Sequence, residues 1–241
     1  MEAEDKEDRP EESPHGSVPR DVFVLAGQSN MSGRGGVRQR RWDGVVPPEC
    51  RPRPGILRFS ARSRWVEATC GIGPGMPFAD AVIPHLLPSD GGEAAAGLVP
   101  CAVGGTAIKE WERGTRLYQQ MLRAVLWYQG ESDAATDHSA AAYGPNMEKL
   151  ICDLRADLDL PSLPVIQVAI TSGEGPGMEK VRRAQLGMHL PGVVCVDARG
   201  LPLNDDQIHL ATAAQVTLGR MLAEAYVKNF LDKEKVEVVV G

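Results

Sequence analysis

Short apolar runs alternate with amphipathic stretches along most of this chain, from residue 21 to residue 230. Runs of four to seven residues, several of them ending at glycine, are typical of buried strands rather than helices. They predict strands at 22–25, 98–103, 123–128, 164–170 and 193–196. Apolar residues at helical spacing predict helices at 77–87, 143–158, 178–189 and 211–230. Strands that alternate with helices predict an α/β fold, a three-layer α/β/α sandwich with a five-stranded parallel sheet.

The segment 32–75 breaks this alternation, because it is rich in Gly, Pro and Arg and shows no sustained periodicity. We expect a small hairpin within it, formed by 56–59 and 64–67. Nine arginines lie between Arg34 and Arg64, and they fit either a substrate-binding rim or a solvated surface loop. The surface loop is the simpler interpretation, although a loop this long inside a compact domain is often functional.

The 241 residues suffice for one large domain with a full core, which we place at 21–230. Residues 1–20 are acidic and lack apolar periodicity, so we expect a disordered tail there. Residues 231–241 are expected to form a C-terminal tail, although its apolar end also fits an edge strand.

The net charge of −6 and the pI near 5.4 argue against nucleic acid or an anionic membrane surface as the main partner. No run approaches the roughly 18 apolar residues of a membrane span, and residues 1–20 lack the apolar core of a secretory signal. The five cysteines are odd in number and show no CxxC spacing. These features predict a reduced, cytoplasmic protein, and they leave its oligomeric state open.

The four residues Gly27-Gln28-Ser29-Asn30 directly follow the first predicted strand. A polar group just beyond the carboxyl end of a strand lies where α/β folds place their ligands, at the edge of the sheet. Ser29 is therefore a candidate nucleophile, with helix capping as the alternative role for a serine at this position. A serine hydroxyl is a weak nucleophile until a neighbouring base takes its proton.

The base is predicted near the other end of the chain, in Asp206-Gln207-Ile208-His209. His209 lies in a loop just before the last predicted helix, whereas the other histidines lie in the tail, in predicted helices or in a polar loop. Across a tight turn, a nearby carboxylate can reach one imidazole nitrogen while the other nitrogen faces the serine. Asp205 and Asp206 are adjacent, so either is a candidate for that carboxylate.

Four blocks, Gly27-Gln28-Ser29-Asn30, Gly104-Gly105-Thr106, Gln129-Gly130-Glu131 and Asp206-x-x-His209, resemble in this order the SGNH hydrolase superfamily. Within it they resemble the plant carbohydrate esterases, which are related to the sialate O-acetylesterases. The resemblance runs from about Asp21 to Phe230 and implies the flavodoxin-like strand order of that superfamily. It also selects Asp206, since the family motif places the aspartate three residues before the histidine.

An acyl-transfer site also needs hydrogen-bond donors for the oxyanion that develops in the transition state. We expect the backbone N–H groups of Ser29 and Gly105 and the side-chain amide of Gln129 in this oxyanion hole, with Gly104 as a rival to Gly105. The esterases that this chain resembles carry Gln where many relatives carry Asn. Glu131 is expected to brace its loop by hydrogen bonding.

The sequence predicts neither a metal nor an organic cofactor, because it lacks clustered His and Cys ligands and the glycine-rich phosphate-binding motifs. The resemblance implies a serine esterase that removes acetyl or other small acyl groups from a carbohydrate ester. A lipase for long acyl chains is disfavoured, because no long apolar lid segment is visible.

The segment between Trp111 and Val125 departs from the family, because relatives usually carry a longer helix there. A truncated crossover would leave part of one sheet face uncovered and could shift Gln129. The alternative is therefore a catalytically silent binding or scaffold protein that keeps the fold.

Overall fold

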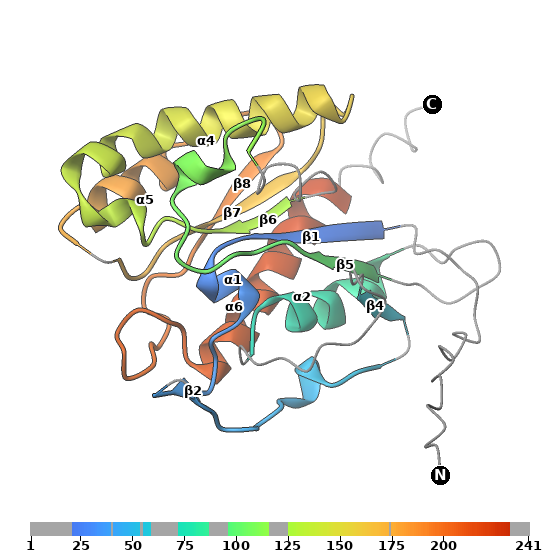
Figure 1. Cartoon of the computed structure of the whole chain (residues 1–241). Helices are drawn as coiled ribbons and strands as arrows, with labels where there is room; N and C mark the ends of the chain where they lie inside the picture. Colours follow the sequence, from blue (N-terminus) through green and yellow to red (C-terminus); the bar gives the residue numbers. More distant parts are fainter. Residues whose placement is uncertain are drawn as a thin grey trace, which may run out of the picture.

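The computed structural model describes residues 21–39, 41–53, 55–58, 72–86, 96–115, 125–173 and 175–231. Six strands of this part of the chain form the central sheet: β1 Asp21–Gly27, β4 Ile56–Arg58, β5 Ala96–Pro100, β6 Val125–Tyr128, β7 Val165–Ala169 and β8 Val193–Asp197. They pair in parallel in the order β4-β5-β1-β6-β7-β8 (Figure 1). The predicted tail at 1–20 and nearly all of the tail at 231–241 lie outside the described residues.

The strand order confirms the predicted α/β class and the flavodoxin-like order, since the five predicted strands lie as second, first, third, fourth and fifth. The predicted strand number was one too low. Ile56–Arg58 pairs in parallel with β5 at the edge of the sheet and does not form an arm of a hairpin. A strand of three residues shows no usable periodicity, and its pairing depends on the free edge of β5. The other predicted arm, 64–67, lies outside the described residues.

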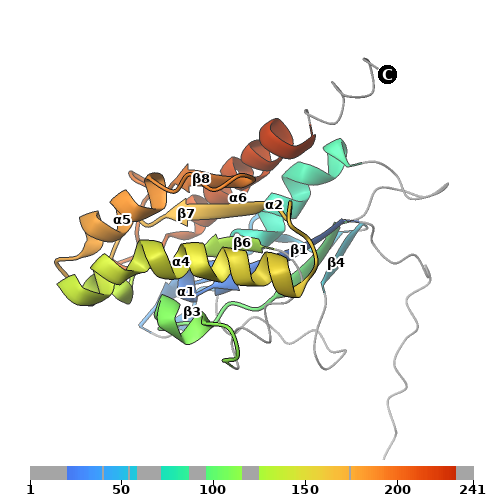
Figure 2. The same ribbon diagram turned by 90° about the horizontal axis from the view of Figure 1, so that it is seen from above.

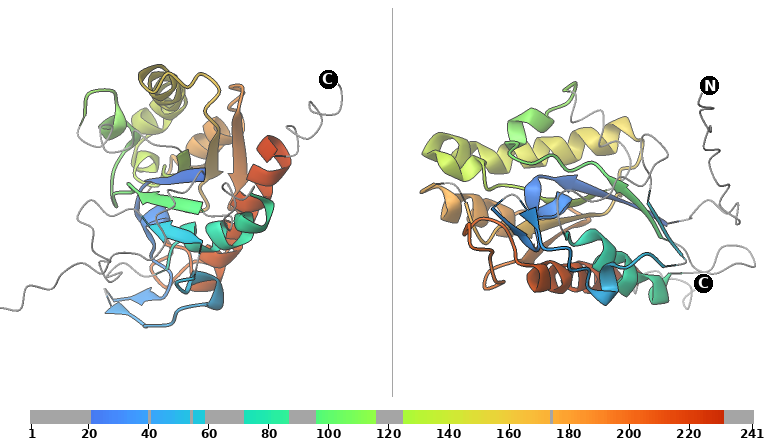
Figure 3. Two further views of the ribbon diagram at one scale, coloured as in Figure 1. Left: turned by 90° about the vertical axis from the view of Figure 1, so that its right-hand side faces the viewer. Right: turned by 60° about the horizontal axis from the view of Figure 1, so that its bottom comes forward.

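Helices cover both faces of the sheet. The longer ones are α2 Gly75–Val82, α4 Asp137–Asp157, α5 Met178–Leu186 and α6 Thr212–Tyr226. Figure 1 shows α4 and α5 on one side of the sheet and α2 and α6 on the other, and the right-hand view of Figure 3 again places the sheet between α4 and α6. In the view from above, α4 crosses over the strands (Figure 2). The predicted three layers are therefore present.

The other described elements are short: α1 Ser29–Ser32, β2 Val37–Arg38, β3 Arg41–Trp42, η1 Pro48–Cys50, η2 Ile83–His85, η3 Ile108–Trp111, η4 Asp133–Ala135 and η5 Val227–Leu231. The small hairpin of β2 and β3 is antiparallel. Helix α2 ends at Val82, before the predicted end at residue 87, because Pro84 cannot continue the α-helical hydrogen bonds, and a 3₁₀ turn follows.

Aromatic side chains fill the space between the sheet and each helix layer. On the α2 and α6 side, the ring of Phe23 meets the edges of Phe78 and Tyr226, with ring centroids 4.8 Å and 5.1 Å away. On the opposite side, the buried rings of Trp111 and Trp127 pack edge to face at 5.2 Å. Edge-to-face pairs of this kind add about 0.5–1.5 kcal/mol to the stabilisation that burial itself provides.

Helix α4 begins six residues before the predicted start at residue 143. Thr136 caps it, because its hydroxyl accepts a hydrogen bond from the backbone N–H of Ser139. Gly144 and Pro145 lie inside the helix and hid this first part from sequence analysis. Neither α4 nor any other helix of the described residues combines the length and the apolar character needed to cross a bilayer.

Much of the crossover that looked short in the sequence, residues 116–124, lies outside the described residues. The elements on either side of it are in place. Trp111, at the end of η3, is fully buried against Trp127 of β6. Arg113 donates to the Asp157 carboxylate and the Asp153 carbonyl of α4, at 2.9 and 3.0 Å. Strand β6 is buried along its whole length and pairs with both β1 and β7. It therefore places Gln129 at the carboxyl ends of the strands, on the same side of the sheet as Ser29.

Candidate active site

Ser29 lies directly beyond the carboxyl end of β1, where Gly27 brings the backbone against β6. Gly27 has φ of 121°, and a Cβ at this position would lie 2.2 Å from the carbonyl oxygen of Tyr128. The next residue, Gln28, donates its backbone N–H to that same carbonyl at 2.9 Å. A glycine is therefore required for the chain to turn here and start α1 with Ser29.

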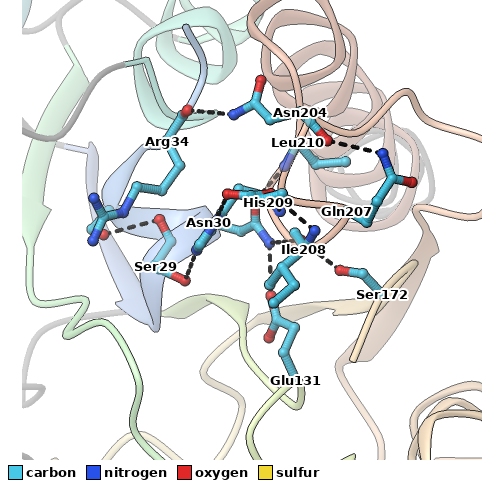
Figure 4. A network of polar contacts seen from close by, with 12 residues as sticks. Ser29, Asn30, Arg34, Glu131, Ser172, Asn204, Gln207, Ile208, His209 and Leu210 are labelled. Carbon is cyan, nitrogen blue, oxygen red and sulfur yellow. Dashed lines mark hydrogen bonds and ion pairs between the residues drawn. The ribbon is translucent and has the colours of Figure 1, made fainter. Parts of the chain in front are cut away.

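The capping alternative for Ser29 does not hold. Gln28 occupies the cap position of α1, and no side chain caps this helix. The hydroxyl oxygen of Ser29 instead lies 2.8 Å from Nε2 of His209, on the loop before α6 (Figure 4). Ser29 is almost completely buried, with 6% of its surface exposed.

His209 is held between Ser29 and Asp206. Its Nδ1 lies 2.7 Å from Oδ2 of Asp206, while Oδ1 of the same carboxylate accepts the backbone N–H groups of Ile208 and His209, both at 2.9 Å. An ionised carboxylate can only accept hydrogen bonds, so Nδ1 carries the proton and Nε2 of the neutral imidazole accepts from Ser29. The residue within the turn, Gln207, has φ of 58°.

Burial raises the pKa of Asp206, but hydrogen bonds from the backbone and the imidazole of His209 and from the Ile208 N–H lower it by more. The pKa of Asp206 is therefore below its ordinary value. Asp206 thus remains a carboxylate near neutrality. Asp205 is exposed and lies 3.8 Å from Nε of Arg38. Of the two adjacent aspartates, the structure brings Asp206 to the histidine.

The loop after β5 lies against Ser29. A Cβ added to Gly104 would lie 3.4 Å from Cβ of Ser29, whereas one added to Gly105, with φ of 73°, would meet nothing within 4 Å. The backbone N–H of Val103 donates to the Gly27 carbonyl at 2.8 Å and ties this loop to the end of β1. Within the described part of the chain, the N–H groups of Ser29, Gly104 and Gly105 have no hydrogen-bond acceptor. All three remain candidate oxyanion donors.

Gln129, at the end of β6, is fully buried and uses its side-chain amide inside the protein. Its Nε2 donates to the Thr106 carbonyl at 2.9 Å and to Oδ2 of Asp133 at 2.5 Å. Both amide hydrogens are thereby used. Its membership of the oxyanion hole stays a prediction, and it requires the amide to exchange one of these bonds when substrate binds. The observed bonds instead tie Gln129 to the Gly104-Gly105-Thr106 loop.

Asp133 is a buried carboxyl group near this loop, and sequence analysis gave it no role. Its Oδ2 also accepts the backbone N–H of Ile108 at 2.9 Å, and only 2% of the residue is exposed. Burial raises the pKa of Asp133 above its ordinary value, although the hydrogen bonds from Gln129 and Ile108 lower it in part. Trp111 completes this network by donating its indole N–H to the Thr106 hydroxyl at 3.1 Å.

The arginines of the long loop that the structure describes serve in part as structural groups. Arg38 lies near Asp205, and Arg53 forms an ion pair with Asp80. The backbone carbonyl of Arg34 accepts the side-chain amide of Asn204 at 2.8 Å, which joins this loop to the histidine loop (Figure 4). The ion pairs of Arg38 and Arg53 fit the surface-loop interpretation.

Two sequence comparisons match this chain to carbohydrate esterases. Residues 19–228 match the family model described as carbohydrate esterase, sialic acid-specific acetylesterase. Over 256 residues the chain is 53% identical to a protein of Arabidopsis thaliana named "probable carbohydrate esterase", with 93% of this chain and 96% of the relative covered.

Solved structures share the fold of this chain. The X-ray structure of an Arabidopsis thaliana protein superposes with a TM-score of 0.82 at 52% identity, over 88% of this chain and all of the other. A carbohydrate acetylesterase of Xanthomonas citri shares the fold, with a TM-score of 0.65 at 23% identity, over 87% of this chain and 56% of the other.

Proposed function

Because the chain belongs to the carbohydrate esterase family described as sialic acid-specific acetylesterases, we propose that it removes acetyl groups from a carbohydrate ester through a serine nucleophile. Membership of this family identifies the chain as a hydrolase of esters. The observation that supports the serine mechanism is the continuous line of contacts from Ser29 through His209 to Asp206.

In the first half of the reaction, Oγ of Ser29 attacks the ester carbonyl carbon as its proton passes to Nε2 of His209. Asp206 holds the imidazole in the tautomer that accepts this proton and stabilises the imidazolium that forms. The oxyanion lies against the free backbone N–H groups of Ser29 and of the Gly104–Gly105 turn. The bond to the sugar oxygen then breaks, and the departing hydroxyl takes the proton from His209.

The second half releases acetate. A water molecule attacks the acetyl group on Ser29 and gives a proton to Nε2 of His209. When the bond between the acetyl carbon and Ser29 breaks, the proton returns to the serine oxygen, and the site is restored. No step requires a metal or an organic cofactor.

The catalytically silent alternative depended on a shifted β6. In the described part of the chain, β6 pairs on both sides, and the three proposed catalytic groups are within hydrogen-bond distance of one another. These contacts support the esterase over the scaffold protein.

Covalent labelling tests the proposal without knowledge of the sugar. A serine-directed fluorophosphonate probe should add one adduct to the wild-type protein, on the peptide that contains Ser29, and none to Ser29→Ala. Ser32→Ala is the matched control, because Ser32 lies on the same short helix and donates to the Ser29 carbonyl; it should still be labelled. Folded wild-type protein that takes up no probe would refute the proposal.

A further inference from the structure

The side chain of Asn30, next to Ser29, connects the nucleophile to the loop that carries the base. Asn30 is fully buried. Its Oδ1 accepts the backbone N–H of Leu210 at 2.8 Å, and its Nδ2 donates to the backbone carbonyl of Ile208 at 3.3 Å. The side-chain amide of Asn30 therefore forms hydrogen bonds to the backbone on both sides of His209 (Figure 4).

Glu131 completes the hydrogen bonds of this amide. Its Oε1 accepts from Nδ2 of Asn30 at 2.7 Å, so both amide hydrogens have acceptors. On the other side, Nε2 of Gln215 lies 3.4 Å from Oδ1 of Asn30 and 3.3 Å from its backbone carbonyl. Because the Leu210 N–H can only donate and the Ile208 carbonyl can only accept, the amide fits in one orientation.

The backbone around His209 is held by two further bonds. Ser172, after β7, donates its hydroxyl to the Ile208 carbonyl at 2.6 Å, and the backbone N–H of Asn204 donates to the His209 carbonyl at 2.6 Å. The bonds from Asn30 differ from these two because Asn30 is the residue next to Ser29, the proposed nucleophile. They span 178 and 180 residues of sequence and join the backbone on both sides of His209 to the residue next to Ser29.

We propose that Asn30, oriented by Glu131, is a positioning residue that fixes the imidazole of His209 against Ser29. This inference rests on the proposed function of Ser29 and His209. Asn30 acts through the backbone and touches no reacting atom. Loss of its contacts should therefore lower kcat and leave KM nearly unchanged, because the substrate contacts are not altered.

A pair of isosteric substitutions tests the inference. Asn30→Asp places a carboxylate oxygen against Glu131 and the Ile208 carbonyl, and should lower kcat for p-nitrophenyl acetate about 10²-fold, the effect of a displacement of about 1 Å. Glu131→Gln alone should be mild, because its amide oxygen can still accept from Asn30. The double variant Asn30→Asp/Glu131→Gln restores the hydrogen bond to residue 131 in the reverse direction but not the one to the Ile208 carbonyl, so it should recover part of the lost kcat. Asn146→Asp, on α4, is the control for the charge change.

A second readout does not depend on hydrolysis. The proton on Nδ1 of His209, bonded to Asp206, should give a low-field proton NMR signal in the wild type and in Glu131→Gln. The signal should be weakened in Asn30→Asp and partly restored in the double variant. If the wild type shows this signal but no esterase activity, the proposed function fails while the positioning role stands. Where Asn30→Asp does not fold, Asn30→Ala replaces it and should show the same losses. Wild-type kcat and signal in the Asn30 variant, or a double variant as impaired as Asn30→Asp, would overturn the inference.

Discussion

Asp206 holds His209 through both of its carboxylate oxygens: Oδ1 accepts the backbone N–H and Oδ2 faces Nδ1 of the imidazole, at 2.9 and 2.7 Å. One side chain thus fixes both the turn and the tautomer of the proposed base. The neighbouring Asp205 makes neither contact and lies toward Arg38.

Asp206→Asn should lower kcat by about 10⁴-fold, because an amide in this position favours the tautomer that carries the proton on Nε2. Asp205→Asn, one residue away and exposed, is the matched control and should keep wild-type activity. Steady-state kinetics on p-nitrophenyl acetate with both variants make the comparison. Equal losses in the two variants would show that the choice of Asp206 is wrong.

The two glycines after β5 should respond differently to substitution. Gly104→Ala places a methyl group against Cβ of Ser29 and narrows the space where the ester must approach, so kcat/KM should fall about 10²-fold. Gly105→Ala meets no neighbouring atom, but its φ of 73° is strained for a residue with a Cβ. It should reduce the free energy of unfolding by about 1–2 kcal/mol.

Urea denaturation and kinetics on both variants separate these effects. If Gly105→Ala loses activity while Gly104→Ala remains active, Gly105 borders the reacting serine instead.

Sequence analysis found the groups that motifs mark and missed those that only the fold brings together. Ser29 could be predicted because it follows the end of a strand, and Asp206 and His209 because of the fixed spacing between them. The contact between Asn30 and Leu210 spans 180 residues and follows no periodicity. Asp133 resembles a surface residue in the sequence, and its burial depends on how η3 packs onto β6. For the same reason the bond from the Gln129 amide to Asp133 could not be predicted from the sequence.

Gly27→Ala should destabilise the fold severely. The added Cβ would clash with backbone atoms of Tyr128, which cannot move without breaking the pairing of β1 and β6. We expect a loss of about 3 kcal/mol or more in the free energy of unfolding. Gly44→Ala is the matched control, because Gly44 also has a positive φ, 75°, but open space around it, and it should lose only about 1–2 kcal/mol. Similar urea midpoints for the two variants would contradict this account of the turn.

Asp133 should make stability depend on pH in an unusual direction. Since its folded pKa is raised above the ordinary 3.8, the folded state binds this proton more tightly than the unfolded chain. Its contribution to stability is therefore largest below pH 3.8 and decreases as pH rises through the folded pKa.

Asp133→Asn keeps an acceptor for Gln129 and Ile108 and removes the titration. The difference in free energy of unfolding, wild type minus variant, should thus fall as pH rises from 3.8 and level off above the folded pKa. Urea denaturation across this range measures it, with Asp205→Asn as the surface control. A difference that does not change with pH would rule out the burial of a titrating carboxyl group.

The hydrolysis of p-nitrophenyl acetate by the purified protein, measured beside Ser29→Ala, tests the central claim most directly. Circular dichroism should first show that both proteins are folded. The account predicts steady turnover by the wild type and a loss in the variant to within about 10³–10⁴-fold of the rate in water, because the oxyanion donors remain. Acetylated sugars are then the substrates to compare. A folded wild type that is as slow as Ser29→Ala would contradict the account.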